Sequence, residues 1–308
     1  MADKYVLIIG GANVDIIGRP YGKLKQNDSN PGFTTMSLGG VARNIAENLA
    51  RLDVTTEFIT VLGNDSHARE IIESCQDLGI GLSHSLFLEE GRTSTYLCIN
   101  DDQGDMQIAI SDMHIYENIS VAYLREKLDI INGAELLIVD TNITEEAIGF
   151  LMESCQVPVF LDTVSTKKTE KIKPFMKNIH TLKPNVIEAE ILSGIAIETD
   201  KDLEKATDLI LQKGIKRLFV TLGERGVYFN DGIKKGLIGS IPAEVVSTTG
   251  AGDSFVAGAV YSFLRGMDIE ESAKLGQAAS NICIRSPLTV SKDMSADNIN
   301  FLVENNWR

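Results

Sequence analysis

One stretch decides how this chain can be interpreted: Ser247-Thr248-Thr249-Gly250-Ala251-Gly252-Asp253-Ser254-Phe255, followed by Val256-Ala257-Gly258-Ala259-Val260. The pattern predicts a tight turn of small residues that leads into an apolar helix. Gly250 and Gly252 let the backbone approach a ligand closely, and the free N–H groups at a helix start favour an anion. Asp253 would repel an anion, so the combination is typical of a site where a phosphoryl group moves and a carboxylate accepts a proton. A glycine-rich helix cap without a ligand is the alternative.

The composition is that of an ordinary globular chain with an acidic balance. The 308 residues are 44% hydrophobic and carry a net charge of −14. No apolar run is long enough to span a membrane, and the acidic balance argues against nucleic acid as a partner. The first residues do not resemble a signal peptide, so we expect a cytoplasmic protein. Four widely spaced cysteines are expected to be reduced core thiols: Cys75, Cys98, Cys155 and Cys283.

Strands alternate with helices along the chain. Apolar runs that end in glycine or polar residues occur at 4–11, 58–65, 135–142, 157–165 and 218–226. Such runs are typical of parallel strands that are buried on both faces. We therefore expect a single domain over residues 1–308, a three-layer α/β/α fold with a mostly parallel central sheet. The first run lacks the GxGxxG spacing and is not followed by a helical pattern, which excludes a dinucleotide-dependent dehydrogenase.

Polar side chains follow two of these strands, at the sheet edge where open α/β folds bind ligands. Asn13 and Asp15 lie two residues apart and would point the same way on an extended chain. Asp140 and Asn142 follow a later strand. Each pair could contact a ligand or simply form a turn, and the residues alone leave both interpretations open.

Asn185 and Glu188 lie three residues apart across a predicted helix start, on one side of its first turn. The spacing suits a helix cap with its capping-box partner. It also suits a pair of oxygen ligands that organises water around a metal ion. Both roles can be held at once.

The stretch at 249–255 resembles the C-terminal signature of the ribokinase-like family of sugar and nucleoside kinases. A second string, Gly39-Gly40-Val41-Ala42-Arg43-Asn44, resembles the family's N-terminal signature. The resemblance covers essentially the whole chain and implies an ATP-dependent kinase. It implies that the backbone of Gly250, Ala251 and Gly252 forms an anion hole and that Asp253 is the catalytic base.

The same resemblance assigns the remaining candidate residues. On the acceptor side it implies that Asn13, Asp15, Gly39, Gly40 and Asn44 bind sugar hydroxyls, with Asp140 and Asn142 as further contacts. On the nucleotide side it implies contacts from Thr221, Gly223, Gly226 and Asn281, although core packing explains Asn281 equally well. Asn185 and Glu188 would hold Mg²⁺ through water. The family usually has Asp where this chain has Ser247, so K⁺ should bind weakly if it binds.

Segments 15–36 and 93–112 are expected to form a small β-sheet lid, because a hairpin pattern surrounds Asp101–Asp105. The family uses such a lid over a small-molecule substrate and often as a homodimer contact. The string Asp112-Met113-His114-Ile115-Tyr116-Glu117 resembles the pseudouridine kinases within the family and favours phosphorylation of the 5′-hydroxyl of pseudouridine. Ribokinase or another sugar or nucleoside kinase is the alternative, followed by a non-catalytic nucleotide-binding regulator.

Overall fold

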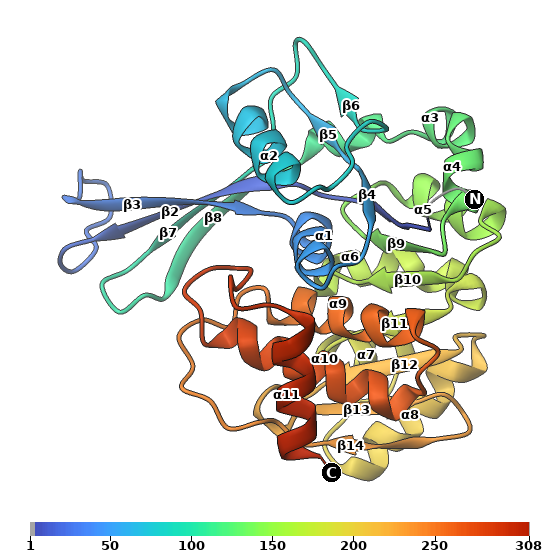
Figure 1. The fold of residues 1–308 in the computed structure, drawn as a ribbon. Helices are drawn as coiled ribbons and strands as arrows, with labels where there is room; N and C mark the ends of the chain where they lie inside the picture. The colour runs from blue at the N-terminus through green and yellow to red at the C-terminus, as the bar shows by residue number, and fades with distance from the viewer. Residues whose placement is uncertain (1–3, 308) are drawn as a thin grey trace.

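An eight-stranded sheet forms the middle layer of the computed structural model, which describes residues 4–307 (Figure 1). In spatial order its strands are β14 (Lys235–Ile238), β13 (Val227–Asn230), β12 (Arg217–Thr221), β11 (Thr181–Lys183), β10 (Val159–Asp162), β9 (Leu136–Asp140), β1 (Val6–Ile9) and β4 (Thr56–Ile59). The strands β12, β11, β10, β9, β1 and β4 pair in parallel, whereas β13 pairs antiparallel with both β12 and β14. The predicted α/β fold with a mostly parallel central sheet is confirmed.

Side chains alternate between the two faces of the sheet and enter two separate cores. In β1, Val6 and Ile8 pack on one face while Leu7 and Ile9 pack on the other. The first face is covered by α1 (Val41–Arg51), α2 (Ser66–Asp77), α9 (Ala251–Leu264), α10 (Ile269–Ile284) and α11 (Ala296–Asn306). The second is covered by α3 (Val121–Glu126), α4 (Leu128–Gly133), α5 (Glu145–Ser154), α7 (Val186–Ser193) and α8 (Asp200–Gln212).

A four-stranded sheet extends away from this body (Figure 1). Its order is β3 (Gly32–Gly39), β2 (Asn13–Pro20), β7 (Thr95–Asn100) and β8 (Met106–Asp112). Only three residues separate β1 of the main sheet from β2 of this small sheet, which is called the lid below. The predicted small sheet is confirmed, and its strands lie close to the predicted segments.

The two faces of the lid differ in polarity. Strand pairing places one residue of each strand in a row across the sheet, and neighbouring rows face opposite sides. The apolar row consists of Met36, Ile16, Leu97 and Ile110. The polar row consists of Ser37, Asp15, Tyr96 and Ser111. The outer strands β3 and β8 are exposed along almost their whole length.

The remaining elements are short: β5 (Val61–Leu62), β6 (Leu86–Phe87), α6 (Thr166–Thr169) and three 3₁₀ segments, η1 (His114–Asn118), η2 (Glu170–Asn178) and η3 (Gly223–Arg225). The run from Lys167 to Lys177 forms α6 and η2. Lys171 turns inward because its ammonium donates to the carbonyl oxygens of Thr141 and Ile143, which follow β9.

Asp65 caps α2 by accepting from the Ala68 N–H at 2.9 Å. All four cysteines are free thiols, as the sequence predicts. Between residues 4 and 307, no helix combines the length and apolar character that crossing a membrane requires.

Candidate active site

The glycine turn opens helix α9 at the edge of the main sheet. Gly250 caps the helix with φ 81°, and a Cβ at this position would lie 1.9 Å from the carbonyl oxygen of Thr289. Only glycine fits both the left-handed backbone and the close approach. The first turn of a helix carries N–H groups without intrahelical partners. Of these, the Ala251 N–H makes only a long 3.3 Å bond to Thr248, which leaves this turn suited to an anion.

Asp253 lies in that first turn and is 8% exposed. The Asn44 amide donates to its Oδ2 at 2.7 Å, so the two quoted sequence strings meet across 209 positions. Burial, followed by the nearby Asp162 carboxylate, raises the pKa of Asp253 to about 7, although the Asn44 hydrogen bond and Lys183 oppose this rise. A carboxylate with a pKa near neutrality can accept a proton under physiological conditions.

Asp162 and Lys183 form a buried ion pair beside this carboxylate, with Nζ and Oδ2 3.1 Å apart. Burial alone would lower the pKa of Lys183, but Asp162 and Asp253 together raise it, so the ammonium stays charged. Its Nζ lies 2.9 Å from where a Cβ of residue 252 would stand, directly beside the glycine turn. Asp162 is fixed in turn by the N–H of Val164, whose φ of 59° is rare for a β-branched residue.

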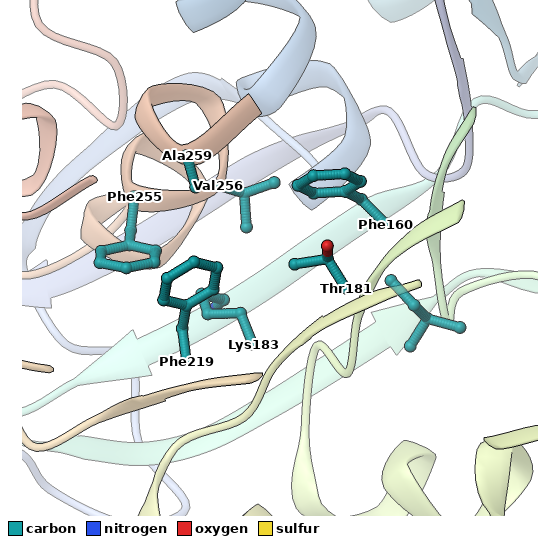
Figure 2. Close-up of a pocket in the computed structure, with 8 residues that line it drawn as sticks. Phe160, Thr181, Lys183, Phe219, Phe255, Val256 and Ala259 are labelled. Atoms are coloured by element: carbon teal, nitrogen blue, oxygen red, sulfur yellow. The ribbon is translucent and has the colours of Figure 1, made fainter. Parts of the chain in front are cut away.

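The aliphatic part of Lys183 lies against an apolar layer below the site. A small cavity there is lined by Phe160, Thr181, Phe219, Phe255, Val256 and Ala259 as well as the lysine (Figure 2). Long lysine side chains commonly bury their stem in this way and direct the ammonium toward polar surroundings. Asp162 and Lys183 were not among the site residues predicted from the sequence. Their position at the ends of β10 and β11, where ligands bind in open sheets, was the available signal.

The acceptor-side candidates gather at the base of the lid. Asn13 donates to Asp15 Oδ1 at 2.6 Å, and a Cβ at Gly39 would stand 2.4 Å from Asp15 Oδ2. Gly40 has φ 97°, and a Cβ added to it would stand 2.4 Å from the carbonyl oxygen of Gly11. The structure therefore brings Asn13, Asp15, Gly39 and Gly40 together, with Gly39 leaving room for the carboxylate.

Asp140 is placed differently from these open groups. It has no exposed surface, and its Oδ2 accepts from the N–H groups of Gly11 and Ala42 at 2.9 and 3.0 Å. The backbone and side chain of Asn142 donate to the same carboxylate. The Asp140 carboxylate therefore joins the segment after β1, the start of α1 and the segment after β9. Asn142 remains partly open, and its Oδ1 accepts a hydrogen bond from the Lys168 ammonium.

A cleft of about 570 Å³ lies on the other side of the glycine turn, within the size range of small-molecule sites. Four predicted nucleotide contacts line it together with Ala251 and Gly252: Thr221, Gly223, Gly226 and Asn281. The Asn281 amide donates to the carbonyl of Ile241 at 2.8 Å, while its Oδ1 is buried without a hydrogen-bond partner. An unpaired buried acceptor at the wall of a cleft is a suitable contact for a ligand donor.

Asn185 and Glu188 form the expected capping box at the start of α7. Glu188 Oε2 accepts from the Asn185 N–H at 2.9 Å and from the Thr163 hydroxyl at 2.7 Å. Within the described part of the chain, no three His, Cys, Asp or Glu side chains gather closely enough to hold a metal ion. Asn185 and Glu188 carry amide and carboxylate oxygens, the hard ligand type that Mg²⁺ takes together with water and phosphate oxygens.

Comparisons with known proteins agree with this geometry. A model for pfkB family carbohydrate kinases matches residues 3–296. The molecule is thus a sugar or nucleoside kinase with the ribokinase fold. The chain belongs to the pfkB family of carbohydrate kinases.

Among its relatives, the pseudouridine kinase of Escherichia coli K12 is 37% identical over 98% of this chain and 97% of its own. An uncharacterized sugar kinase of the same strain is 36% identical over 97% of this chain and 83% of its own. A crystal structure from Clostridium perfringens, provisionally described as a sugar kinase, is 37% identical with a TM-score of 0.89. It covers 99% of this chain, and the match spans 97% of that structure.

Proposed function

We propose that this kinase transfers the γ-phosphoryl group of ATP to the 5′-hydroxyl of pseudouridine. The observation that carries the proposal is the position of Asp253. This carboxylate, with a pKa of about 7, lies between the acceptor-side residues and the cleft beside the glycine turn. A base in this place can reach a hydroxyl on one side while the phosphate chain lies on the other.

In the proposed reaction, the acceptor hydroxyl gives its proton to Asp253 as its oxygen bonds to the γ-phosphorus. The bond from that phosphorus to the β–γ bridging oxygen breaks in line, and ADP leaves. The N–H groups of Ala251, Gly252 and Asp253 and the Lys183 ammonium offset the charge on the transferred group. Mg²⁺, held through water by Asn185 and Glu188, would supply further neutralisation of the phosphate oxygens.

ATP suits the cleft for a structural reason. The unpaired Asn281 Oδ1 can accept from an exocyclic amino group such as that of adenine. Thr221, Gly252 and Asn281 line the same cleft, so a nucleotide bound there would have its phosphates within reach of the first turn of α9. Asn185 stands next to this cleft, because its backbone pairs with Thr221.

The acceptor assignment rests on the groups at the lid base and on the 37% identical relative. Asn13, Asp15 and Asn44, with Gly39 and Gly40, would bind ribose hydroxyls. Pseudouridine carries a ring N–H that uridine lacks, and an acceptor opposite that donor would discriminate between them. Asp140 has its oxygens occupied, so Asn142 Oδ1 and Asp112 at the end of β8 are the remaining candidates.

A kinase for ribose or another sugar is the second candidate, since the sugar kinase relative is almost equally similar. The residues at the lid base would bind ribose with or without a base. A regulator without chemistry is less well supported, because Asp253 and Gly250 are both in place.

The deciding experiment measures kcat/KM with ATP for pseudouridine, uridine, ribose and adenosine under one set of conditions. We expect pseudouridine to be the best substrate, with uridine and ribose much poorer, because only pseudouridine carries the ring N–H that an acceptor such as Asn142 Oδ1 or Asp112 would pair. A higher value for ribose or adenosine would refute the substrate assignment and leave the kinase class unaffected.

Two further features belong to the same proposal. Ser247 offers no carboxylate to a monovalent cation, so any activation by K⁺ should be modest.

The apolar row of the lid is exposed, with Met36 at 53% and Ile110 at 59%. We propose that this face pairs with the lid of a second copy of the chain, because a large apolar patch favours burial.

A further inference from the structure

Arg43 is a buried arginine between the base of the lid and the catalytic carboxylate. It is 3% exposed, and its guanidinium is held on several sides. Its Nε donates to the Gly39 carbonyl at 3.0 Å, and its Nη2 donates to the Leu38 carbonyl at 2.9 Å. Its Nη1 pairs with Glu47 at 2.7 Å. Nη2 also donates to the Asn44 side-chain oxygen.

The last of these contacts fixes the orientation of Asn44. A carboxamide has an acceptor end and a donor end, whereas arginine only donates and an ionised carboxylate only accepts. With Arg43 on one side and Asp253 on the other, only one orientation satisfies both neighbours. The Asn44 oxygen faces Arg43, and its nitrogen donates to Asp253 Oδ2 at 2.7 Å.

We propose that Arg43 is a positioning residue that orients the Asn44 carboxamide and so keeps Asp253 in place as an ionised base. The inference rests on the proposed function, in which Asp253 accepts the hydroxyl proton. It also connects the base to the lid, because Leu38 and Gly39 are the last two residues of β3. Binding of an acceptor under the lid is thereby linked to the protonation state of the base.

Other charged or titratable groups face the same carboxylate. Asp162 at the end of β10, Asp140 at the end of β9 and Lys183 in β11 influence Asp253, and the Cys283 thiol of α10 lies close to it. On its other sides, Arg43 faces Glu47, Asp15 and the Cys75 thiol. An Arg43→Lys variant keeps the positive charge and leaves these groups in place. It removes the forked geometry that holds Asn44 and two carbonyls together.

The test compares pH profiles of kcat/KM for the wild type, Arg43→Lys and a matched control, Arg51→Lys. Arg51 binds the same Glu47 carboxylate at 2.8 Å from one turn further along α1. In the wild type, activity should rise with pH through a midpoint near 7. In Arg43→Lys the loss of the oriented amide should move this midpoint up by about one pH unit, with roughly tenfold lower activity at pH 6 and recovery at high pH. The Arg51→Lys profile should match the wild type.

An unchanged midpoint in Arg43→Lys, or an equal loss at every pH, would overturn the inference. So would the same shift in Arg51→Lys. If circular dichroism shows that Arg43→Lys does not fold, Asn44→Ala provides the second test. Its midpoint must also rise, and an unchanged midpoint overturns the inference. Failure of the proposed function itself would appear elsewhere, as full turnover in Asp253→Asn.

Discussion

The catalytic end of the main sheet and the lid hold their polar groups in contrasting ways. At the catalytic end, Asp253, Asn44 and Asp140 are each at most 8% exposed and hydrogen-bonded to groups distant in the sequence. In the lid, Asp15 is paired with Asn13 two residues away, and the outer strands are open to solvent. The contrast indicates that the chemical groups are arranged in advance, whereas enclosure of the acceptor depends on a weakly packed sheet. Changes at the first region should affect rate, and changes at the second should affect acceptor affinity.

The strongest test of this contrast is Asp253→Asn. Loss of a positioned general base should lower turnover by roughly 10²–10⁴-fold. ATP binding should persist, because removing a negative charge does not weaken an anion site. Single-turnover kinetics and ATP binding by calorimetry would measure the two effects.

Asp77→Asn is the matched control for that substitution. Asp77 is exposed at the end of α2, so turnover should be unchanged. If Asp253→Asn turned over at a rate near that of the wild type in chemistry-limited conditions, Asp253 would not be the base.

The same substitution, Asp253→Asn, should also change the stability of the fold. Burial raises the pKa of Asp253 from 3.8 to about 7, so the native state binds this proton more tightly than the unfolded state does. Stability therefore falls as pH rises from about 4 to about 7, and the cost is complete above that range. Asp253→Asn removes the cost and should raise the free energy of unfolding at pH 8 by up to about 4 kcal/mol.

Urea unfolding at pH 8 and pH 4 would measure this difference, which should almost vanish at pH 4. A variant less stable than the wild type at pH 8 would show that ionised Asp253 is held by contacts stronger than its burial cost.

The smallest expected effect comes from the lid. Ile110→Lys places a charge in the apolar row and should separate a lid-to-lid dimer. The KM for the nucleoside should rise on the order of tenfold, because a lid without its partner copy is less ordered over the acceptor and binding must supply that ordering. The kcat should stay close to that of the wild type.

Sedimentation velocity and steady-state kinetics would follow both changes. Phe301→Lys in α11 is the control, since Phe301 is similarly exposed at 64% but lies outside the lid. A wild type that sediments as a monomer, or a dimer that Ile110→Lys leaves intact, would exclude pairing through this face.

The fold could be predicted because its signals are local. Parallel strands buried on both faces appear as continuous apolar runs, and the turn before α9 is marked by Gly250, which no other residue can replace. Asn44 and Asp253 were chosen from separate strings, each with its own pattern. Their 2.7 Å contact is a property of the fold and not of either string.

The site residues that the sequence could not identify depend on contacts between segments that only the fold brings together. Lys183 looks like any strand residue until β10 and β11 bring it to Asp162. Arg43 resembles a surface arginine of an amphipathic helix until β3 covers it. From the sequence, Asp140 could contact a ligand or form a turn, and the structure surrounds it with backbone N–H groups from two other segments. Such contacts form between residues far apart in the sequence and leave no local pattern.

Asp140 also joins the two chain segments that connect β2 and β3 to the main body. The chain enters β2 just after Gly11 and leaves β3 just before Ala42, and the N–H groups of both residues are attached to this one carboxylate. If β2 and β3 rotate about this point, the axis would lie close to Asp140. Asp15, near that axis, would then move little, while the turn between β2 and β3 would move furthest. Opening of the lid would thus leave the Asp15 carboxylate in place.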